Sequence, residues 1–376
     1  MGQARIVRSQ IRVLHAEARD GIAMSFSALR RRSMVLVELT DSTGATGRGE
    51  SWVNFPSWAA AERVATLREG VLPLLEGQDP DRITAVHDTL TRTLAPLGRQ
   101  WGAPGPVAQA ISAADVALWD LRARRARVGI ADSGGGRVRD DIAVYASSLG
   151  PTGVADLASR CQDEGYTALK VKLGFGAETD EANLAAVRRI CGPEMDIYGD
   201  ANQAWSLAEA VAAAPMLREH GVAWIEEPVR GDRLPDLEAL YERTGLAIAT
   251  GENIYGRNDF WSYVDSEAVA LVQPDLSKTG GLTEALAVCE LAQARGKSVA
   301  PHLYGGAAAF LATLQLAAMA PPVSIVEYDV RDNPLRDPLL RQPPQPVAGR
   351  LRIPTGPGLG VEFDTDALHE NSEVIA

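Results

Sequence analysis

Two lysines and three carboxylates in this chain have the types and spacing of a site that binds a metal ion and moves a proton. The lysines stand one residue apart in the segment "ALKVKLGF", so an extended strand points both ammonium groups to the same face. Buried like charges are costly unless opposite charges face them. Three acidic residues follow at intervals of 26 residues, each near the end of an apolar run. These five residues are Lys170, Lys172, Asp200, Glu226 and Glu252.

The three carboxylates predict a divalent cation. Without a cation, converging carboxylates would repel one another. An all-oxygen ligand set suits Mg²⁺, with Mn²⁺ as the alternative, because zinc sites prefer nitrogen and sulfur ligands. We therefore predict that Asp200, Glu226 and Glu252 bind one metal ion, and that the two lysines face this anionic centre.

Further polar residues end the later apolar runs, and they suit proton transfer next to a carboxylate. His302 comes one unit after Asp275, and a carboxylate partner would hold one imidazole tautomer and raise its basicity. A cation, an ammonium group and a hydrogen-bond donor can stabilise the charge that develops when a proton α to a carboxylate is removed. Lys172 must be neutral to act as the base, and the ammonium of Lys170 would lower its pKa. Glu327 could donate a hydrogen bond if it is protonated.

The elements that would position these residues alternate between strands and helices from about residue 140 onward. Eight apolar strands recur about every 25 residues, and the segments between them have helical spacing. We predict an α/β fold with a (β/α)8 TIM-like barrel over residues 126–335, whose active site lies at the carboxyl ends of the strands. No G-x-G-x-x-G turn follows the first strand, which argues against a doubly wound nucleotide-binding sheet.

The first third of the chain has a different pattern. Alternating strands and three helical segments predict an α+β N-terminal capping domain over residues 1–125. The loops at about 18–32 and 50–56 would act as lids over the barrel mouth. The Pro- and Gly-rich residues 336–376 would return to pack on the capping domain.

The lid residues give two hints about the substrate, and the hints conflict. An apolar wall suits a less hydroxylated acid, and we predict it from Met24, Phe26, Trp52 and Phe55. A basic run could bind a second carboxylate, although a solvated face is the simpler interpretation; it consists of Arg30, Arg31 and Arg32. As substrate-binding residues we name Lys170, Asn202, Trp52 and Phe26. Asn202 and Lys278 are also candidates for residues that contact the predicted metal ligands and hold them in position.

Composition limits the partners. A net charge of −12 argues against nucleic acid and anionic membranes. Three widely spaced cysteines form no disulfide framework or zinc motif, and we find no apolar signal or spanning segment. We expect a soluble cytoplasmic protein that acts on a small-molecule carboxylate.

The motifs together resemble those of the enolase superfamily, in its mandelate racemase-like subgroup. The matching segments, in order, are "KVK", "DANQAW", "IEEP", "GEN", "QPDLSKTGG", "PHLYGG" and "VEYD". The resemblance implies that Lys172 and the dyad of His302 with Asp275 are acid/base groups on opposite faces of the substrate. It also implies that Lys170 contacts the substrate carboxylate, that Glu327 stabilises the enolate oxygen, and that the protein is a homo-oligomer.

Several outcomes stay open for the metal-stabilised enolate. Protonation of a β-hydroxyl by His302 would make the enzyme an acid-sugar dehydratase, which we favour. Return of a proton to the α-carbon on the opposite face would make it a racemase or epimerase. A cycloisomerase would use Lys278 as the opposing base. A barrel that only binds or assembles is the alternative outside enzymes, and a zinc-dependent hydrolase would need more histidines at strand ends.

Overall fold

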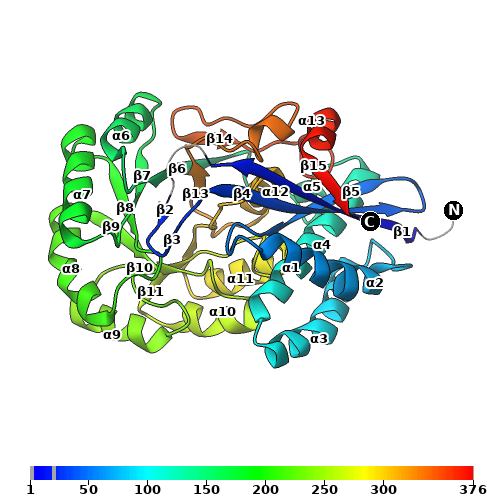
Figure 1. The fold of residues 1–376 in the computed structure, drawn as a ribbon, viewed down its shortest axis with the longest axis horizontal. Coiled ribbons are helices and arrows are strands. Elements are labelled where there is room, and N and C mark those ends of the chain that lie inside the picture. The colour runs from blue at the N-terminus through cyan, green and yellow to red at the C-terminus, as the bar shows by residue number, and fades with distance from the viewer. Residues whose placement is uncertain (1–3, 19–22, 376) are drawn as a thin grey trace.

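The computed structural model describes residues 4–18 and 23–375, and these form two domains side by side (Figure 1). The capping domain, blue and cyan, lies at one end of the molecule. The barrel, green to orange, lies at the other end, and the carboxyl end of the chain returns to the capping domain. None of the described helices combines the length and the apolar composition needed to cross a bilayer.

Among the described residues, an antiparallel sheet and six helical elements build the capping domain. The sheet has the order β15-β1-β4-β5, with strands β1 (Ile6–Glu17), β4 (Arg31–Asp41), β5 (Thr46–Trp52) and β15 (Ser372–Ile375). Two short strands, β2 (Ala23–Met24) and β3 (Ser27–Ala28), form a hairpin in the first predicted lid, whose residues 19–22 lie outside the described residues. The helical elements are α1 (Ala59–Thr66), the π-helical turn η1 (Leu67–Val71), α2 (Leu72–Leu75), α3 (Ile83–Trp101), α4 (Pro104–Ala126) and α5 (Ile130–Ser133).

Two glycines allow α4 to lie directly on β5. A Cβ atom at Gly49 would stand 2.0 Å from the carbonyl oxygen of Ala113, and one at Gly47 would stand 2.2 Å from that of Ala117. No side chain fits in such a gap, so glycine on the strand and alanine on the helix set the distance between the two elements. This contact fixes α4 between the sheet and the barrel.

The barrel contains eight parallel strands whose carboxyl ends share one rim, as the sequence predicts. The strands are β6 (Asp141–Leu149), β7 (Ala168–Lys172), β8 (Asp196–Asp200), β9 (Val222–Glu226), β10 (Ile248–Thr250), β11 (Val269–Val272), β12 (Ser298–Val299) and β13 (Val326–Asp329). They pair in the order β12-β11-β10-β9-β8-β7-β6-β13. The residues before β13 complete the ring, because Val299 donates to Pro322 and Ser324 donates to Val299 through the backbone.

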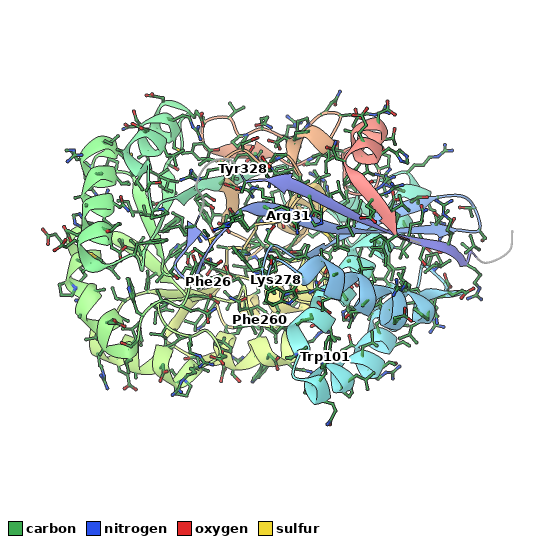
Figure 2. All side chains as sticks on the ribbon, in the orientation of Figure 1. Phe26, Arg31, Trp101, Phe260, Lys278 and Tyr328 are labelled. Carbon is green, nitrogen blue, oxygen red and sulfur yellow. The ribbon has the colours of Figure 1, made fainter. Side chains whose placement is uncertain are left out.

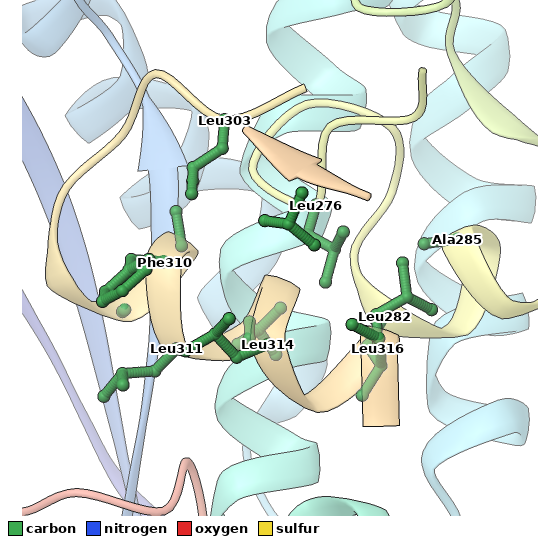
Figure 3. Packing of buried hydrophobic residues seen from close by; sticks show 14 of the residues in the cluster. Leu276, Leu282, Ala285, Leu303, Phe310, Leu311, Leu314 and Leu316 are labelled. Atoms are coloured by element: carbon green, nitrogen blue, oxygen red, sulfur yellow. The ribbon is translucent and has the colours of Figure 1, made fainter. Parts of the chain in front are cut away.

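Seven helices connect these strands on the outside of the barrel (Figure 1). They are α6 (Val154–Asp163), α7 (Ala177–Cys191), α8 (Leu207–Glu219), α9 (Leu234–Thr244), α10 (Gly256–Asp265), α11 (Leu282–Ala294) and α12 (Ala307–Met319). Helix α12 is buried all round, because the capping domain covers the face that solvent would otherwise reach. Figure 3 shows its side chains Phe310, Leu311, Leu314 and Leu316 in the same core as Leu276, Leu282 and Leu303.

The carboxyl-terminal residues contact both domains. After the short 3-10 helix η2 (Asp337–Leu339), β14 (Arg350–Arg352) pairs with the first barrel strand, β6. Helix α13 (Thr365–Glu370) then leads to β15, which pairs with β1 of the capping sheet. The contact with the barrel was not part of our expectation for residues 336–376.

Buried polar contacts tie the capping domain to the barrel. Glu50 accepts hydrogen bonds from the backbone N–H groups of Gly306 (2.6 Å) and Ala309 (2.9 Å), at the start of α12. Arg32 is 2% exposed and its Nη2 lies 2.6 Å from Oδ2 of Asp329, at the end of β13. Neither interpretation of the basic run was right for Arg32, because its charge is used inside the protein, whereas Arg30 and Arg31 are exposed.

Candidate active site

The residues predicted from the strand ends meet at the rim of the barrel, beneath the capping domain. Lys172, Asp200 and Glu226 are neighbours in the register of β7, β8 and β9, so their side chains leave the sheet at one height. All eight of the predicted polar residues are buried, with at most 8% of each exposed; they are Lys170, Lys172, Asp200, Glu226, Glu252, Asp275, His302 and Glu327.

The two lysines face carboxylates, as expected. Nζ of Lys170 lies 2.8 Å from Oε2 of Glu226 and 2.9 Å from Oε1 of Glu327. Nζ of Lys172 lies 2.5 Å from Oδ2 of Asp200 and donates to Oδ1 of Asn202 at 2.9 Å. Burial alone would lower the pKa of Lys170, but Glu226 and Glu327 outweigh burial and raise it well above the usual value. The anionic partners therefore make the two buried ammonium groups tolerable.

The carboxylate donors fit a divalent cation. Oε1 of Glu226 is buried and has no hydrogen-bond partner, which is costly for a polar atom in a protein interior and which a cation would relieve. Burial and the charge of Asp200 raise the pKa of Glu226 to about 7. Among the described residues, ligand atoms of Glu226, Glu252 and His302 lie within 4.8 Å of one another. Asp200 is not in this group, and its Oδ2 contacts Nζ of Lys172. The set of Asp200, Glu226 and Glu252 as the metal ligands stays a prediction.

His302 lies between two carboxylates. Its Nδ1 is 2.7 Å from Oδ2 of Asp275, and its Nε2 is 2.8 Å from Oε2 of Glu252. Burial lowers the pKa of His302, but Glu252 and the other carboxylates raise it to about 10. Asp275 is itself held in place, because its Oδ1 accepts from the backbone N–H (2.7 Å) and the hydroxyl (2.5 Å) of Ser277. The structure thus brings together the two members of the predicted dyad.

Glu327 is an acceptor in this structure, whereas the donor role predicted for it would require a proton. Its Oε1 accepts from the hydroxyl of Ser147 (2.6 Å) and contacts Nζ of Lys170, while its Oε2 accepts from the backbone N–H of Leu303 (3.0 Å). Burial would raise the pKa of Glu327, but Lys170 and His302 lower it to about 2. Three donors from different strands and loops therefore keep this buried carboxyl group ionised.

Lys278 lies among the predicted site residues, although in the sequence it comes three residues after the strand-end residue Asp275. It is 2% exposed, and its Nζ is 3.3 Å from Oε1 of Glu252 and 4.3 Å from the centre of the Trp52 ring. Burial would lower its pKa, but Glu252 and Asp275 raise it above the usual value. In Figure 2, Lys278 and Phe26 lie in the middle of the molecule, where the capping domain meets the barrel.

One cavity of about 470 Å³ joins the rim of the barrel to the capping domain. Its barrel side includes Lys172, Asn202, Glu252, His302 and Glu327. Its capping side includes all four residues of the predicted apolar wall, Met24, Phe26, Trp52 and Phe55. The rings of Phe26, Phe55 and Trp52 contact one another in sequence, with centroids 5.3 Å and 6.1 Å apart. Phe26 is nevertheless 62% exposed, so it stands at the mouth of the cavity.

Several polar residues of the cavity were not predicted from the sequence. Arg63 of α1, Gln109 of α4 and Tyr255 before α10 all line it. Arg63 and Gln109 lie within helices. A polar residue in a helix does not indicate a binding site until the packing of that helix is known. Tyr255 follows the motif "GEN" by two residues, which is the one signal that could have found it.

Comparison with known families shows to which superfamily the chain belongs. Residues 8–133 match the family described as "Mandelate racemase / muconate lactonizing enzyme, N-terminal domain", and residues 153–367 match "Enolase C-terminal domain-like". The chain belongs to the enolase superfamily. Within it, the amino-terminal match places the chain in the mandelate racemase/muconate lactonizing enzyme family, as the motifs suggested. It is an enzyme, either a lyase or an isomerase.

Similar members of the enolase superfamily act on acid sugars. A D-galactarolactone cycloisomerase of Agrobacterium fabrum is 34% identical over 355 residues, which cover 90% of this chain and 91% of that protein. An arabinonate dehydratase of Saccharolobus solfataricus is 29% identical over 362 residues, which cover 94% of both chains.

Solved structures of enolase-superfamily proteins share the whole fold. A mandelate racemase/muconate lactonizing enzyme from Bordetella bronchiseptica is 34% identical, with a TM-score of 0.87 over 98% of this chain and 100% of the other. A 3,6-anhydro-D-galactonate cycloisomerase from Zobellia galactanivorans is 28% identical, also with a TM-score of 0.87, over 98% of this chain and 99% of the other.

Proposed function

We propose that this enzyme removes the proton α to the carboxylate of an acid sugar and then eliminates water from the β-carbon. The observation that carries the proposal is that Lys172 and His302 line one cavity together with the buried carboxylates Glu252 and Glu327. Lys172 ends β7 and His302 follows β12, and β13 and β6 separate these two strands in the ring. Two proton-transfer groups therefore approach the same bound molecule from different sides.

The proposed cation ligands are Asp200, Glu226 and Glu252. A bound Mg²⁺ would supply positive charge that makes the carboxylate of the substrate a better acceptor of the electron pair left by the α-proton. Lys170 would add a fixed positive charge at the same oxygens.

The proton transfers follow from the positions of the two groups. Lys172, in its neutral form, takes the α-proton, and the electrons of the C–H bond move onto the carboxylate oxygens. Protonated His302 then gives its proton to the β-hydroxyl group. A carbon–carbon double bond forms, the C–O bond breaks and water leaves. Asp275 orients His302 through the 2.7 Å contact with Nδ1 and stabilises its charged form.

A cycloisomerase is the second candidate, and two observations favour it. A relative that is 34% identical is a cycloisomerase, and Lys278 lies on the cavity wall as a third possible proton-transfer group. Glu252 contacts both His302 (2.8 Å) and Lys278 (3.3 Å), so this contact does not separate the two groups. Dehydration stays our first choice, because Asp275 also holds Nδ1 of His302 and stabilises its protonated form.

Proton exchange in deuterated water tests both candidates. The magnesium-loaded enzyme would be incubated in ²H₂O with a library of sugar acids and their lactones, and the products would be followed by NMR. We expect loss of water from at least one acid and no reaction after chelation. Lys172→Ala should stop α-proton exchange, whereas His302→Asn should allow exchange but stop the loss of water. Ring opening or closure without loss of water would establish the cycloisomerase. No exchange with any acid would reject both candidates.

We expect a cytoplasmic homo-oligomer that binds neither nucleic acid nor membranes. The three cysteines of the chain, Cys161, Cys191 and Cys289, are free and buried, which suits a reducing compartment. Light scattering of the purified protein would measure the oligomeric state.

A further inference from the structure

We propose that Arg63 binds a second anionic group at the far end of the substrate, so that the preferred acid is a dicarboxylate of the aldaric type. This inference rests on the proposed function, and it names the substrate class of the same site.

Arg63 is a buried cation that lacks a close carboxylate partner. It is 1% exposed, and its Nη1 donates to the hydroxyl of Ser51 and to the carbonyl oxygen of Trp52 (3.0 Å). Its Nη2 donates to the amide oxygen of Gln109 at 2.6 Å. All three of these acceptors are neutral. The carboxylate of Glu62 is 3.4 Å from Nη2, and its side chain is 24% exposed.

One edge of the guanidinium group lacks a close carboxylate partner, and its Nε is closed to solvent. Nε of Arg63 is buried and has no hydrogen-bond partner. Nε and Nη2 share one edge of the group, and a carboxylate binds such an edge through two parallel hydrogen bonds. The long contact with Glu62 is the only carboxylate contact on this edge among the described residues. Glu62 and Arg63 both line the cavity. An incoming carboxylate that replaced the long contact on Nη2 would also bring an acceptor toward Nε.

Other buried arginines of the protein have closer carboxylate partners than Arg63 has. Arg32 lies 2.6 Å from Asp329, Arg12 lies 2.6 Å from Glu38, and Arg336 lies 2.8 Å from Asp337. The pKa values of Arg32 and Arg336 are raised by their carboxylates despite burial. In contrast, burial lowers the pKa of Arg63 to about 10, because Glu62 only partly offsets the loss of water.

The position of Arg63 in the cavity suits the far end of a bound acid. Arg63 and Gln109 line the capping side of the cavity that contains Lys172 and His302 on the barrel side. The side chain of Trp52 lies between the two ends, because its ring covers Lys278 (4.3 Å) while its carbonyl oxygen accepts from Arg63. A diacid with one carboxylate at the barrel rim would extend along Trp52 and place its second carboxylate near Arg63.

A purely structural role is the competing explanation, since Arg63 also holds β5 and α4 together through Ser51 and Gln109. Two isosteric substitutions separate the explanations without removing Arg63. Gln109→Glu would give the guanidinium group an internal carboxylate, which should not weaken the fold but should repel an anionic substrate end. Glu62→Gln would remove the weak carboxylate partner and should favour an anionic substrate end.

The test uses the magnesium-loaded full-length enzyme and matched pairs of acids. Each pair has the same stereochemistry and differs only at the last carbon, as galactonate with galactarate and gluconate with glucarate do. We would measure kcat/KM for α-proton exchange and the thermal stabilisation that each acid gives. For the wild type, we expect the diacid to exceed the monoacid by about tenfold to a hundredfold, the value of one charge-assisted contact.

The variants give opposite shifts if the inference is correct. Gln109→Glu should lower kcat/KM and binding for the diacid by about tenfold or more, with little change for the monoacid. Glu62→Gln should keep or increase the preference for the diacid. An unchanged ratio of diacid to monoacid in both variants would overturn the inference while leaving the proposed function intact. If no acid exchanges a proton, the proposed function fails, and the thermal stabilisation by each pair still tests Arg63.

Discussion

Replacement of Lys170 by methionine tests whether the site is an anionic cluster that needs positive charge. The Nζ atom of Lys170 lies within 3 Å of Glu226 and Glu327 and 3.6 Å from Oδ2 of Asp200, and the side chain is 1% exposed. Methionine keeps the apolar stem and removes the charge. Three buried carboxylates would then lose their shared cation.

The expected loss of stability is large without metal and smaller with it. Breaking a buried ion pair by removing one partner costs about 3–5 kcal/mol. Mg²⁺ should restore part of this loss, because a ligand that binds only the folded state stabilises it. Urea unfolding followed by circular dichroism, in a chelating buffer and in excess Mg²⁺, would measure both effects. Proton exchange should stay about a hundredfold or more below wild type even with Mg²⁺, because the fixed charge at the substrate oxygens is missing.

Lys297→Met is the matched control. Lys297 is also in the barrel, but its Nζ donates to backbone carbonyl oxygens, including that of Val269 (2.6 Å), and not to carboxylates. It should lose stability equally with and without Mg²⁺ and keep proton exchange. If Lys170→Met is as stable as wild type in the chelating buffer, or if Mg²⁺ stabilises both variants equally, the reasoning about the anionic cluster is wrong.

Three further substitutions test the dyad of His302 with Asp275 and the packing of the capping domain. Asp275→Asn removes the carboxylate at Nδ1 of His302 and leaves only Glu252 at Nε2. The loss of water should slow about a hundredfold or more while α-proton exchange by Lys172 continues, as NMR would show. Glu50→Ala leaves two buried N–H groups at α12 unpaired and should cost about 2 kcal/mol or more in urea unfolding. Burial raises the pKa of Glu50 to about 7, so the free energy of unfolding of the wild type should fall relative to that of this variant as the pH rises from 4.5 to 7. If the difference in unfolding free energy between the two proteins does not change over this range, that pKa is contradicted. Gly49→Ala should destabilise the protein by about 3 kcal/mol or more, because its Cβ would meet the backbone of α4. In the same assay the control Gly70→Ala should stay within about 1 kcal/mol of wild type, because its Cβ would meet only a side chain at 3.6 Å.

The barrel and its rim could be predicted from the sequence because they depend on local repetition. A strand followed by a helix repeats about every 25 residues, and parallel strands in a ring place their carboxyl ends at one rim. Asp200 and Glu226 therefore had to lie at similar heights, and their registered strands show this. The dyad of Asp275 and His302 follows from the same rule.

Protonation states were harder to predict than positions. The donor role predicted for Glu327 requires a proton, whereas Ser147, Lys170 and the backbone of Leu303 all donate to it or face it with positive charge. These partners come from three places far apart in the chain. The sign of a pKa shift in a buried group depends on the balance between lost water and such partners, and the sequence does not contain that balance.

The sequence by itself determined which strands have candidate site residues at their carboxyl ends. A strand recurs about every 25 residues, so the position of a residue in the chain gives its position around the barrel. Only the tertiary structure decided what closes the cavity opposite the barrel. Gly47 and Gly49 let α4 approach β5, and α4 brings Gln109 to the cavity wall. Helix α1 brings Arg63 to the same wall, whereas Arg32 of β4 lies in the interior, paired with Asp329 of the barrel. The direction of a side chain on a docked helix or strand depends on packing between distant segments, and no local pattern encodes it.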